Sequence, residues 1–272
     1  MTDAALSEAR AFWNEYAPQF EARLEATTLQ LARPLIAHLR LESAEAVLEV
    51  GGGAGGAAAL LLEGAPTAAR LVVTDLAPGM VEAARRKLPA RVEVQEADAQ
   101  ALPFPDRSFD RILANLNLML VPDPDAALRE AARLLRPGGL YAFSVWGRRE
   151  QSALFTLPPA AAQQVGLELA EPARSNFHLG DREATRRRVA AHGFDRVVAW
   201  YHPMLRELHD GDAFAASVLE TPRWRAALAE QPDALARRLR GAMASLADEH
   251  LEAGAPIGLD ALLVVARRRE AP

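Results

Sequence analysis

A glycine-rich turn is the part of the chain whose residue types and spacing are best suited to binding chemistry. The β-compatible stretch Val47–Val50 leads into five glycines and one alanine at Gly51–Gly56, and the helix-prone stretch Ala57–Leu62 follows. A buried strand that turns directly into a helix needs glycine, because glycine tolerates positive φ and lets a ligand approach the backbone. The start of the helix then offers free N–H groups to a polar ligand. This pattern predicts a loop that binds a nucleotide-containing cofactor.

Three acidic residues stand at the ends of strands close to this turn. Glu49 precedes the loop by two residues, and a carboxylate there suits a cationic ammonium group better than a pyrophosphate, which it would repel. Asp75 ends the next predicted strand, at the place of a ribose-binding carboxylate. Asp98 follows the third strand, where it could accept a hydrogen bond from an adenine amino group. Glu49 and Asp98 therefore argue against a nicotinamide dinucleotide, whereas the position of Asp75 fits the dinucleotide-binding pattern.

The same glycines nevertheless fit the dinucleotide-binding fingerprint. The spacing Gly51-x-Gly53-x-x-Gly56 matches it literally, so an NAD(P)-dependent oxidoreductase is an alternative interpretation. Against that alternative, Lys87 is the only lysine and Ala83 stands four residues before it, which excludes a Tyr-x-x-x-Lys dehydrogenase pair.

Short apolar segments alternate with helical ones around the turn, which predicts a parallel sheet covered by helices on both faces. Ligands of such sheets bind at the carboxyl ends of the strands, near the point where strand order reverses. The expected strands are Ala46–Val50, Leu71–Asp75, Arg91–Gln95, Phe109–Leu116, Leu140–Trp146, Val197–His202 and Leu259–Arg267. The expected helices are Gly55–Gly64, Pro78–Lys87, Pro124–Leu135 and Arg182–Gly193, with a turn at Arg136–Gly139.

Two further segments lie outside this alternation and are expected to be helical. Residues 3–40 carry apolar positions at three- and four-residue spacings, divided by Pro18 and Pro34. They either cover the sheet as an ordinary pair of helices or form a lid over a ligand, with Tyr16 and Phe20 facing inward. Residues 209–256 form a long helical insertion before the last strand, and we expect them to cap the ligand-binding edge.

The composition excludes several kinds of site and partner. The 272 residues hold no cysteine, which excludes disulfides, thiolate metal sites and cysteine nucleophiles and fits a cytoplasmic protein. No metal site is expected. The net charge of −5 argues against nucleic acid as a partner, because phosphate binding needs a basic surface. We also expect no membrane span and no secretory signal, since neither pattern occurs.

Four stretches in the first half of the chain carry a family resemblance. They are Val47–Gly55, Val73–Met80, Ala97–Asp110 and Leu134–Gly139, in the expected order and spacing. With them the chain resembles the class I S-adenosylmethionine-dependent methyltransferases. The likeness is strongest to the small-molecule (methyltransferase type 11) group that includes ubiquinone/menaquinone-biosynthesis-type enzymes.

This resemblance implies an α/β fold with a Rossmann-like, seven-stranded sheet in the order 3-2-1-4-5-7-6, the last strand being antiparallel. With the two helical segments outside the alternation, we expect an N-terminal helical lid, a cofactor-binding core and a helical substrate cap. The lid would be residues 1–40, the core residues 41–147, 182–208 and 257–272, and the cap residues 148–181 and 209–256.

The resemblance also implies which residues hold S-adenosylmethionine and its product S-adenosylhomocysteine. The methionine part would lie over the glycine loop with Glu49 nearby, while Asn115 closes the site from the end of the fourth strand and Tyr16 contributes from the lid. The loop residues concerned are Gly51, Gly52, Gly53 and Gly55.

For the adenosine part, the same resemblance implies five contacts. Asp75 would accept hydrogen bonds from both ribose hydroxyls, with Leu76 and Met80 on the adenine side. Asp98 would bind the adenine amino group, and Ala99 would contribute its backbone.

Methyl transfer from a sulfonium proceeds by in-line displacement, so the protein mainly aligns the acceptor and excludes water. An acceptor that must lose a proton also needs a base, and histidine is the natural one near neutral pH. His202, ending the sixth strand, is the first candidate, His178 the second and His209 the third. For any one of these histidines, the more common case is an ordinary hydrogen-bonded or exposed side chain.

The expected acceptor is a small, partly hydrophobic organic molecule, methylated at O, N or C. Its pocket would be lined by the lid, by the apolar stretch Leu118–Leu120 and by aromatic residues such as Phe214 and Trp224. These aromatic residues could instead simply pack the cap. A non-catalytic S-adenosylmethionine-binding protein is a further alternative, and we expect a monomer or homodimer.

Overall fold

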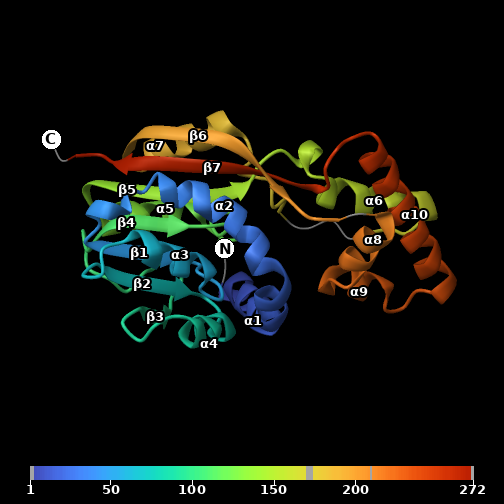
Figure 1. Ribbon diagram of the computed structural model, residues 1–272, viewed down its shortest axis with the longest axis horizontal. Helices are drawn as coiled ribbons and strands as arrows, with labels where there is room; N and C mark the ends of the chain where they lie inside the picture. The colour runs from blue at the N-terminus through green and yellow to red at the C-terminus, as the bar shows by residue number, and fades with distance from the viewer. Residues whose placement is uncertain (1–2, 170–173, 209, 271–272) are drawn as a thin grey trace. The chain divides into compact units, whose positions relative to one another are not determined.

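In the computed structural model, which describes residues 3–169, 174–208 and 210–270, the strands form one seven-stranded sheet in the order β3-β2-β1-β4-β5-β7-β6 (Figure 1). β1 pairs in parallel with β2 and β4, and β5 pairs in parallel with β4 but antiparallel with β7. The predicted sheet order and antiparallel last strand are therefore confirmed. The strands are β1 (Ala46–Val50), β2 (Arg70–Asp75), β3 (Glu93–Glu96), β4 (Phe109–Ala114), β5 (Leu135–Trp146), β6 (Phe194–Leu205) and β7 (Gly258–Arg268).

Contacts within the chain divide it into two compact units. Unit 1 comprises Met1–Gly147, Asn176–His202 and Ala261–Pro272, and unit 2 comprises Arg148–Ser175 and Pro203–Asp260. The end of β6 and the start of β7 fall in unit 2, whereas the rest of the sheet lies in unit 1. The glycine-rich turn after β1 therefore belongs to unit 1.

The helices of unit 1 flank the sheet. They are α1 (Asp3–Gln19), the π-helical turn η1 (Phe20–Leu24), α2 (Glu25–Ala37), the 3₁₀ turn η2 (Leu41–Ser43), α3 (Gly56–Gly64), α4 (Pro78–Lys87), α5 (Pro124–Leu134) and α7 (Arg182–Ala191). In Figure 1, α1 lies beside α4, and α2 lies beside α3 and β5. α1 ends at Gln19, one residue after Pro18, and η1 separates it from α2, as predicted for Pro18. Pro34 lies inside α2, where it removes one backbone donor without ending the helix, so the prediction that Pro34 divides the segment was wrong.

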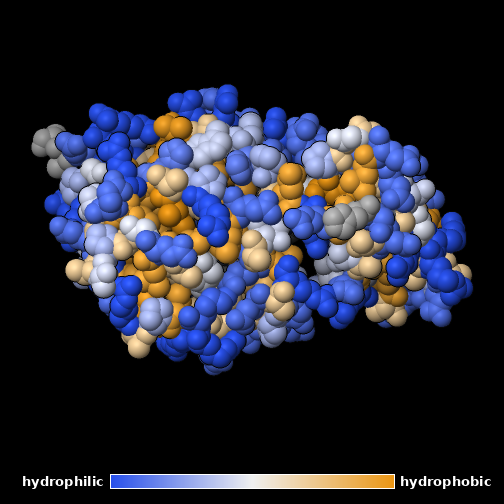
Figure 2. Space-filling view, in the orientation of Figure 1, coloured by the Kyte–Doolittle hydropathy of each residue, from blue (hydrophilic) through white to orange (hydrophobic). Residues whose placement is uncertain are grey.

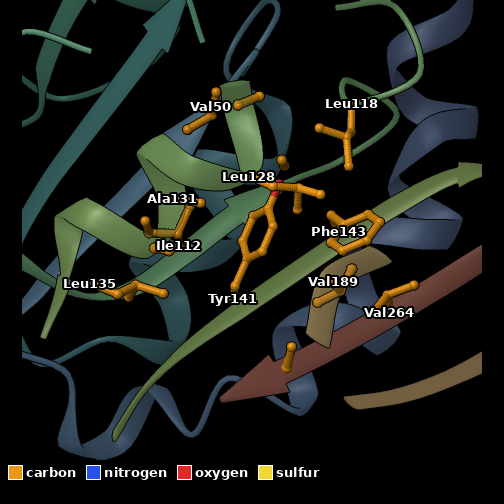
Figure 3. Close-up of a cluster of buried hydrophobic side chains, with 14 of the residues drawn as sticks. Val50, Ile112, Leu118, Leu128, Ala131, Leu135, Tyr141, Phe143, Val189 and Val264 are labelled. Carbon is orange, nitrogen blue, oxygen red and sulfur yellow. The ribbon is translucent and has the colours of Figure 1, made fainter. Parts of the chain in front are cut away.

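The largest hydrophobic core of unit 1 joins the sheet to α5 and α7. Figure 3 shows this core, whose labelled side chains are Val50, Ile112, Leu118, Leu128, Ala131, Leu135, Tyr141, Phe143, Val189 and Val264. Leu118 and Met119, which follow β4, are each only 2% exposed in it. In the predicted pocket wall Leu118–Leu120, core side chains therefore enclose Leu118 and Met119, whereas Leu120 is only partly buried against the same core.

The beginning of β5 also differs from the prediction. Leu135 pairs with Phe109, and the register then shifts between Phe109 and Arg111. The segment Arg136–Gly139, predicted as a turn before the strand, is therefore an irregularity inside a longer strand, with Gly138 at φ +80°. Glycine takes this backbone conformation without the steric cost that a Cβ atom would impose.

Unit 2 is helical and has a core of its own. Its helices are η3 (Arg149–Gln151), α6 (Ala153–Val165), α8 (Gly211–Leu219), α9 (Pro222–Leu228) and α10 (Asp233–Glu252). α10 packs on α6 and α8, and Phe214 and Trp224 are buried in the core between the helices. Of the two interpretations of this aromatic pair, packing of the cap itself is the one the structure supports. At the start of the unit, Arg148 Nε donates to the buried Asp260 over 3.0 Å.

On the face shown in Figure 2, hydrophilic residues interrupt the hydrophobic surface of each unit. Within the described ranges, no helix has the length and apolar character needed to cross a membrane.

Candidate cofactor-binding site

The glycine loop leaves β1 through three residues in the left-handed region. Gly51, Gly53 and Gly55 have φ values of +66°, +55° and +88°, and Gly55 is the N-cap of α3. Side chains with a Cβ atom rarely adopt this conformation, so glycine is required at these positions. The backbone N–H of Gly52 donates to Thr74 O over 3.0 Å, which ties the loop to β2. The predicted strand–loop–helix is present with the predicted strand, Ala46–Val50.

Asp75, at the end of β2, holds the middle of the loop. Its Oδ2 accepts from the Gly53 N–H and its Oδ1 from the Ala77 N–H, each over 2.9 Å. Burial raises the pKa of Asp75 above its ordinary value, although these backbone amides act in the opposite direction. A carboxylate with two oxygens offers about four acceptor positions, so both oxygens retain capacity for a further donor.

Glu49 lies beneath the loop and is only 1% exposed. A Cβ atom placed on Gly52 would lie 3.1 Å from Glu49 Oε2, so the carboxyl group sits directly against the loop backbone. Among the described residues, this Oε2 atom has no hydrogen-bond partner. Desolvation, together with the nearby carboxylates of Asp75 and Glu25, raises the pKa of Glu49 from 4.5 to about 8. A buried acid of this kind is suited to receive a cationic group.

Met80 and Leu76, which are predicted to contact adenine, lie near residues of α1. Met80 is 2% exposed and forms a small cluster with Ala17 and Ala77, against which Trp13 and Phe20 pack. Tyr16, predicted to contact the cofactor, lies on α1 in an aromatic group and stacks on Phe12 with a centroid distance of 5.6 Å. Leu76 lines a hollow of about 200 Å³ together with Leu6, Ser7 and Arg10.

Asp98 and Ala99 follow β3 as predicted. Asp98 Oδ1 accepts from the backbone N–H of Gln100 over 2.9 Å and from its side-chain amide over 3.0 Å. Ala99 packs against the main core of unit 1. Asp98 therefore stabilises its own turn, and its second function as an adenine acceptor stays a prediction.

Asn115 lies one residue beyond the end of β4, in a strained turn. Its Oδ1 accepts from Ser144 Oγ over 2.7 Å, and its Nδ2 donates to Thr28 O over 3.1 Å. Leu116 has φ +53°, and its N–H donates to the same Ser144 hydroxyl over 2.9 Å. This backbone explains why β4 ends at Ala114, before the predicted Leu116. Strained backbone of this sort is concentrated at ligand sites, so Leu116 and Ser144 join the candidate site.

Three further side chains cover the glycine loop and were not among the predicted cofactor contacts. Phe20 lies over Gly53, where an added Cβ atom would be 2.9 Å from the ring. Glu25 Oε1 accepts from the Gly56 N–H over 2.7 Å, and Asn117 occupies the space next to Gly51. Inward-facing Phe20 was expected from helical spacing, whereas nothing in the local sequence indicates Glu25 or Asn117.

The two histidines proposed as bases lie on the other side of the sheet's centre. In the order β1-β4-β5-β7-β6, four strand spacings of about 4.8 Å place His202 of β6 about 19 Å from β1. His178 lies in the turn before α7, and this turn is tied to β6 because Tyr201 Oη donates to Gly180 O over 3.1 Å. The fold therefore brings the segments of His178 and His202 together. His209 lies outside the described residues.

In the described ranges, no group of three or more His, Asp or Glu side chains could hold a metal ion.

Comparison with known proteins places this site in a family. Residues 48–143 match the methyltransferase domain family, and they contain the glycine loop, Asp75, Asp98 and Asn115. The chain carries a class I S-adenosylmethionine-dependent methyltransferase domain. The cofactor of this domain is S-adenosylmethionine.

Two curated relatives are similar over part of the chain. The Xanthomonas campestris ubiquinone/menaquinone biosynthesis C-methyltransferase is 38% identical over 112 residues, which are 39% of this chain and 44% of the relative. The Thermus thermophilus demethylmenaquinone methyltransferase is 44% identical over 105 residues, which are 37% of this chain and 47% of the relative. The chain thus aligns with less than half the length of these relatives.

Structural similarity extends over nearly the whole chain. A chain in the complex between the Haloferax volcanii Trm112 methyltransferase activator and a methyltransferase superposes with a TM-score of 0.60 at 20% identity. It covers 95% of this chain and 98% of that one. At this identity the similarity concerns the fold.

The residues at the glycine loop fit S-adenosylmethionine on chemical grounds. Glu49 presents an oxygen atom that has no partner in the described part of the chain, buried below a loop that only glycine can form. The methionine part of the cofactor carries an ammonium group that could pair with such an acid, and Asp75 retains acceptor capacity for hydroxyl groups.

Proposed function

We propose that this protein transfers a methyl group from S-adenosylmethionine to a small, partly hydrophobic organic acceptor. The observation that carries the proposal is the buried Glu49 carboxyl group, whose Oε2 lacks a partner in the described structure and lies directly under the glycine loop. A pyrophosphate above this acid would be repelled once the acid ionised, whereas an ammonium group would be attracted. An S-adenosylmethionine enzyme therefore accounts for Glu49 better than a nicotinamide oxidoreductase does.

The residue roles within the proposal follow the geometry of the loop. Glu49 pairs with the ammonium group, and the backbone of Gly51–Gly55 passes under the methionine part. Asp75 already orders the loop through the Gly53 N–H and would add the ribose hydroxyls to its donors. Asn115, fixed by Ser144 and Thr28, presents a rigid corner at the end of β4.

The remaining cofactor contacts surround the adenine ring. Leu76 and Met80 offer apolar surface, Asp98 an acceptor for the amino group, and Ala99 its backbone. Tyr16 belongs to residues 1–40, which act as a lid over this side.

When bound, S-adenosylmethionine supplies a methyl group already activated on a sulfonium. The chain's own residues must then hold the acceptor in line with it and keep water out. An acceptor hydroxyl, ammonium or acidic C–H would pass its proton to an imidazole nitrogen of His202, or alternatively of His178. Since β6 is about 19 Å from β1, this base serves only an acceptor that lies along the carboxyl edge of the sheet.

The acceptor is less closely defined than the cofactor. Residues 148–181 and 209–256 form the segment that we assign to acceptor binding, with residues 41–147, 182–208 and 257–272 as the cofactor core. One curated relative is named a C-methyltransferase, which supports carbon alongside oxygen and nitrogen as the methylated atom.

Calorimetric titration tests the proposal most directly. We expect S-adenosylhomocysteine to bind and NADH not to bind, because Glu49 favours an ammonium group over a pyrophosphate. Incubation with S-adenosylmethionine and a panel of phenols, amines and quinols should then release S-adenosylhomocysteine. Binding of NADH alone would refute the assignment, and tight cofactor binding without turnover on any acceptor would indicate a non-catalytic binding protein.

A further inference from the structure

The N-terminal segment of unit 1 occupies the surface of the glycine loop that the proposed function reserves for the cofactor. Phe20 covers Gly53, and Glu25 reaches the first residue of α3. Both side chains come from the junction of α1 and α2, which is far from the loop in the sequence. The loop is therefore covered by the protein's own chain.

Glu25 is held from both sides. Its Oε1 accepts from the Gly56 N–H over 2.7 Å, at the N-terminal end of α3, where the helix dipole favours a negative charge. Its Oε2 accepts from Nζ of Lys87, the only lysine of the chain, at the end of α4. A charge-assisted bond to a backbone N–H is a strong interaction, and here the carboxylate comes from within the protein rather than from a ligand.

The π-helical turn η1 explains how Phe20 and Glu25 reach the loop together. The Glu25 N–H donates to Phe20 O, which is the five-residue bond of a π-helix. An α-helix would instead bond residue 24 to residue 20, and residues five apart would lie on different faces of it. Single π turns inside helices are frequent at functional sites, so this turn is more than an irregularity of packing.

Electrostatics oppose a purely structural role for Glu25. Three carboxyl groups, those of Glu25, Glu49 and Asp75, surround one loop, and the charges of Glu25 and Asp75 both disfavour ionisation of Glu49. An arrangement that served only to pack α2 on the loop would not require a third acid there. A third acid is useful if its carboxylate leaves when a ligand with its own carboxylate and ammonium groups arrives.

We propose that Glu25 is an internal competitor for the cofactor, a carboxylate that occupies the start of α3 until the carboxylate of S-adenosylmethionine displaces it. This competition rests on the proposed function, because it concerns the same loop. Phe20 moves off Gly53 with the same π turn when Glu25 leaves.

The test compares two glutamates of the same segment. Glu25→Gln weakens the contact with Lys87 and the helix end, so we expect S-adenosylhomocysteine to bind the variant roughly tenfold more tightly than the wild type in calorimetry. Glu21→Gln is the matched control. Glu21 pairs with Arg86 over 3.1 Å and approaches Lys87, but it makes no contact with the loop backbone in the described hydrogen bonds. Its affinity should stay within about twofold of the wild type.

Hydrogen–deuterium exchange without any ligand supplies a second measurement. In Glu25→Gln, residues 10–25 and 51–62 should exchange faster than in the wild type, whereas Glu21→Gln should leave both segments unchanged. Lys87→Gln, which removes the other partner of Glu25, provides an independent variant should Glu25→Gln fail to fold, and the same increase in affinity is expected for it.

The outcomes separate the competition from the proposed function. A wild type that binds S-adenosylhomocysteine, with Glu25→Gln binding equally or more weakly, overturns the competition and leaves the proposed function intact. Failure of every variant to bind S-adenosylhomocysteine overturns the proposed function and the competition with it. Tighter binding and faster exchange in Glu25→Gln, but not in Glu21→Gln, support both.

Discussion

Replacement of Glu49 by glutamine tests the physical basis of the site without any ligand. Burial raises the pKa of this carboxyl group from 4.5 to about 8, so the folded protein holds a proton that the unfolded chain loses near pH 4.5. The folded state binds more protons over this interval, and the stability of the wild type must therefore fall as the pH rises from about 4.5 to about 8. Glu49→Gln cannot ionise and should lack this decline.

The size of the effect follows from the same two values. Each pH unit between 4.5 and about 8 corresponds to roughly 1.36 kcal/mol, which gives about 5 kcal/mol once Glu49 is fully ionised. Between about pH 5 and about pH 7.5 the wild type should lose about 3 kcal/mol relative to Glu49→Gln. For a chain of this size, that difference corresponds to roughly 6–12 °C in Tm.

Thermal unfolding followed by far-ultraviolet circular dichroism at both pH values provides the measurement. The relevant quantity is the difference between wild type and Glu49→Gln, because all other titrating groups are shared. Acids with lowered pKa values, such as Asp125 and Glu130, have the opposite effect and make the stability rise with pH. Their effect is confined to pH values below about 4, where these acids ordinarily titrate. Equal pH dependence in the two proteins would refute a buried, protonated Glu49.

Three further outcomes are expected for the cofactor site and for the proposed base. Binding of S-adenosylhomocysteine near pH 7 should release about one proton in wild type but none in Glu49→Gln, measured by calorimetry in buffers of different ionisation enthalpy, because the ammonium group favours the ionised acid. Asp75→Ala should weaken that binding by about 1–3 kcal/mol through lost ribose hydrogen bonds; unchanged affinity would remove Asp75 from the cofactor site. His202→Ala should lower turnover while leaving cofactor affinity intact, and turnover equal to that of the wild type would exclude His202 as the base.

The regular part of the fold was predictable because its signals are local. Ala46–Val50 is a run of β-compatible residues followed by glycines, and both the strand and the positive φ values of the loop follow from sterics at each residue. The sheet order came from the family resemblance rather than from periodicity. Local signals failed where the register shifts, as at Arg136–Gly139, since a Pro-Gly-Gly sequence suits a turn and an irregular strand equally well.

Predictions about side-chain roles succeeded less uniformly for a related reason. Phe214 and Trp224 are aromatic residues in a helical insertion, and the sequence could not distinguish a pocket lining from a core. Likewise Leu118 and Met119 follow β4 where a pocket wall was expected, yet the surrounding core side chains enclose them.

By itself, the sequence determined the strand, the glycine loop and the presence of acids at the ends of strands. Only the tertiary structure decided what those acids do. The side chain of Glu25 accepts a hydrogen bond from the N–H of Gly56, which lies 31 residues later in the chain. A local sequence pattern does not indicate a contact over this separation. The raised pKa of Glu49 likewise arises from burial and from Asp75 and Glu25 converging on one loop, an environment that exists only after three separate segments have packed together.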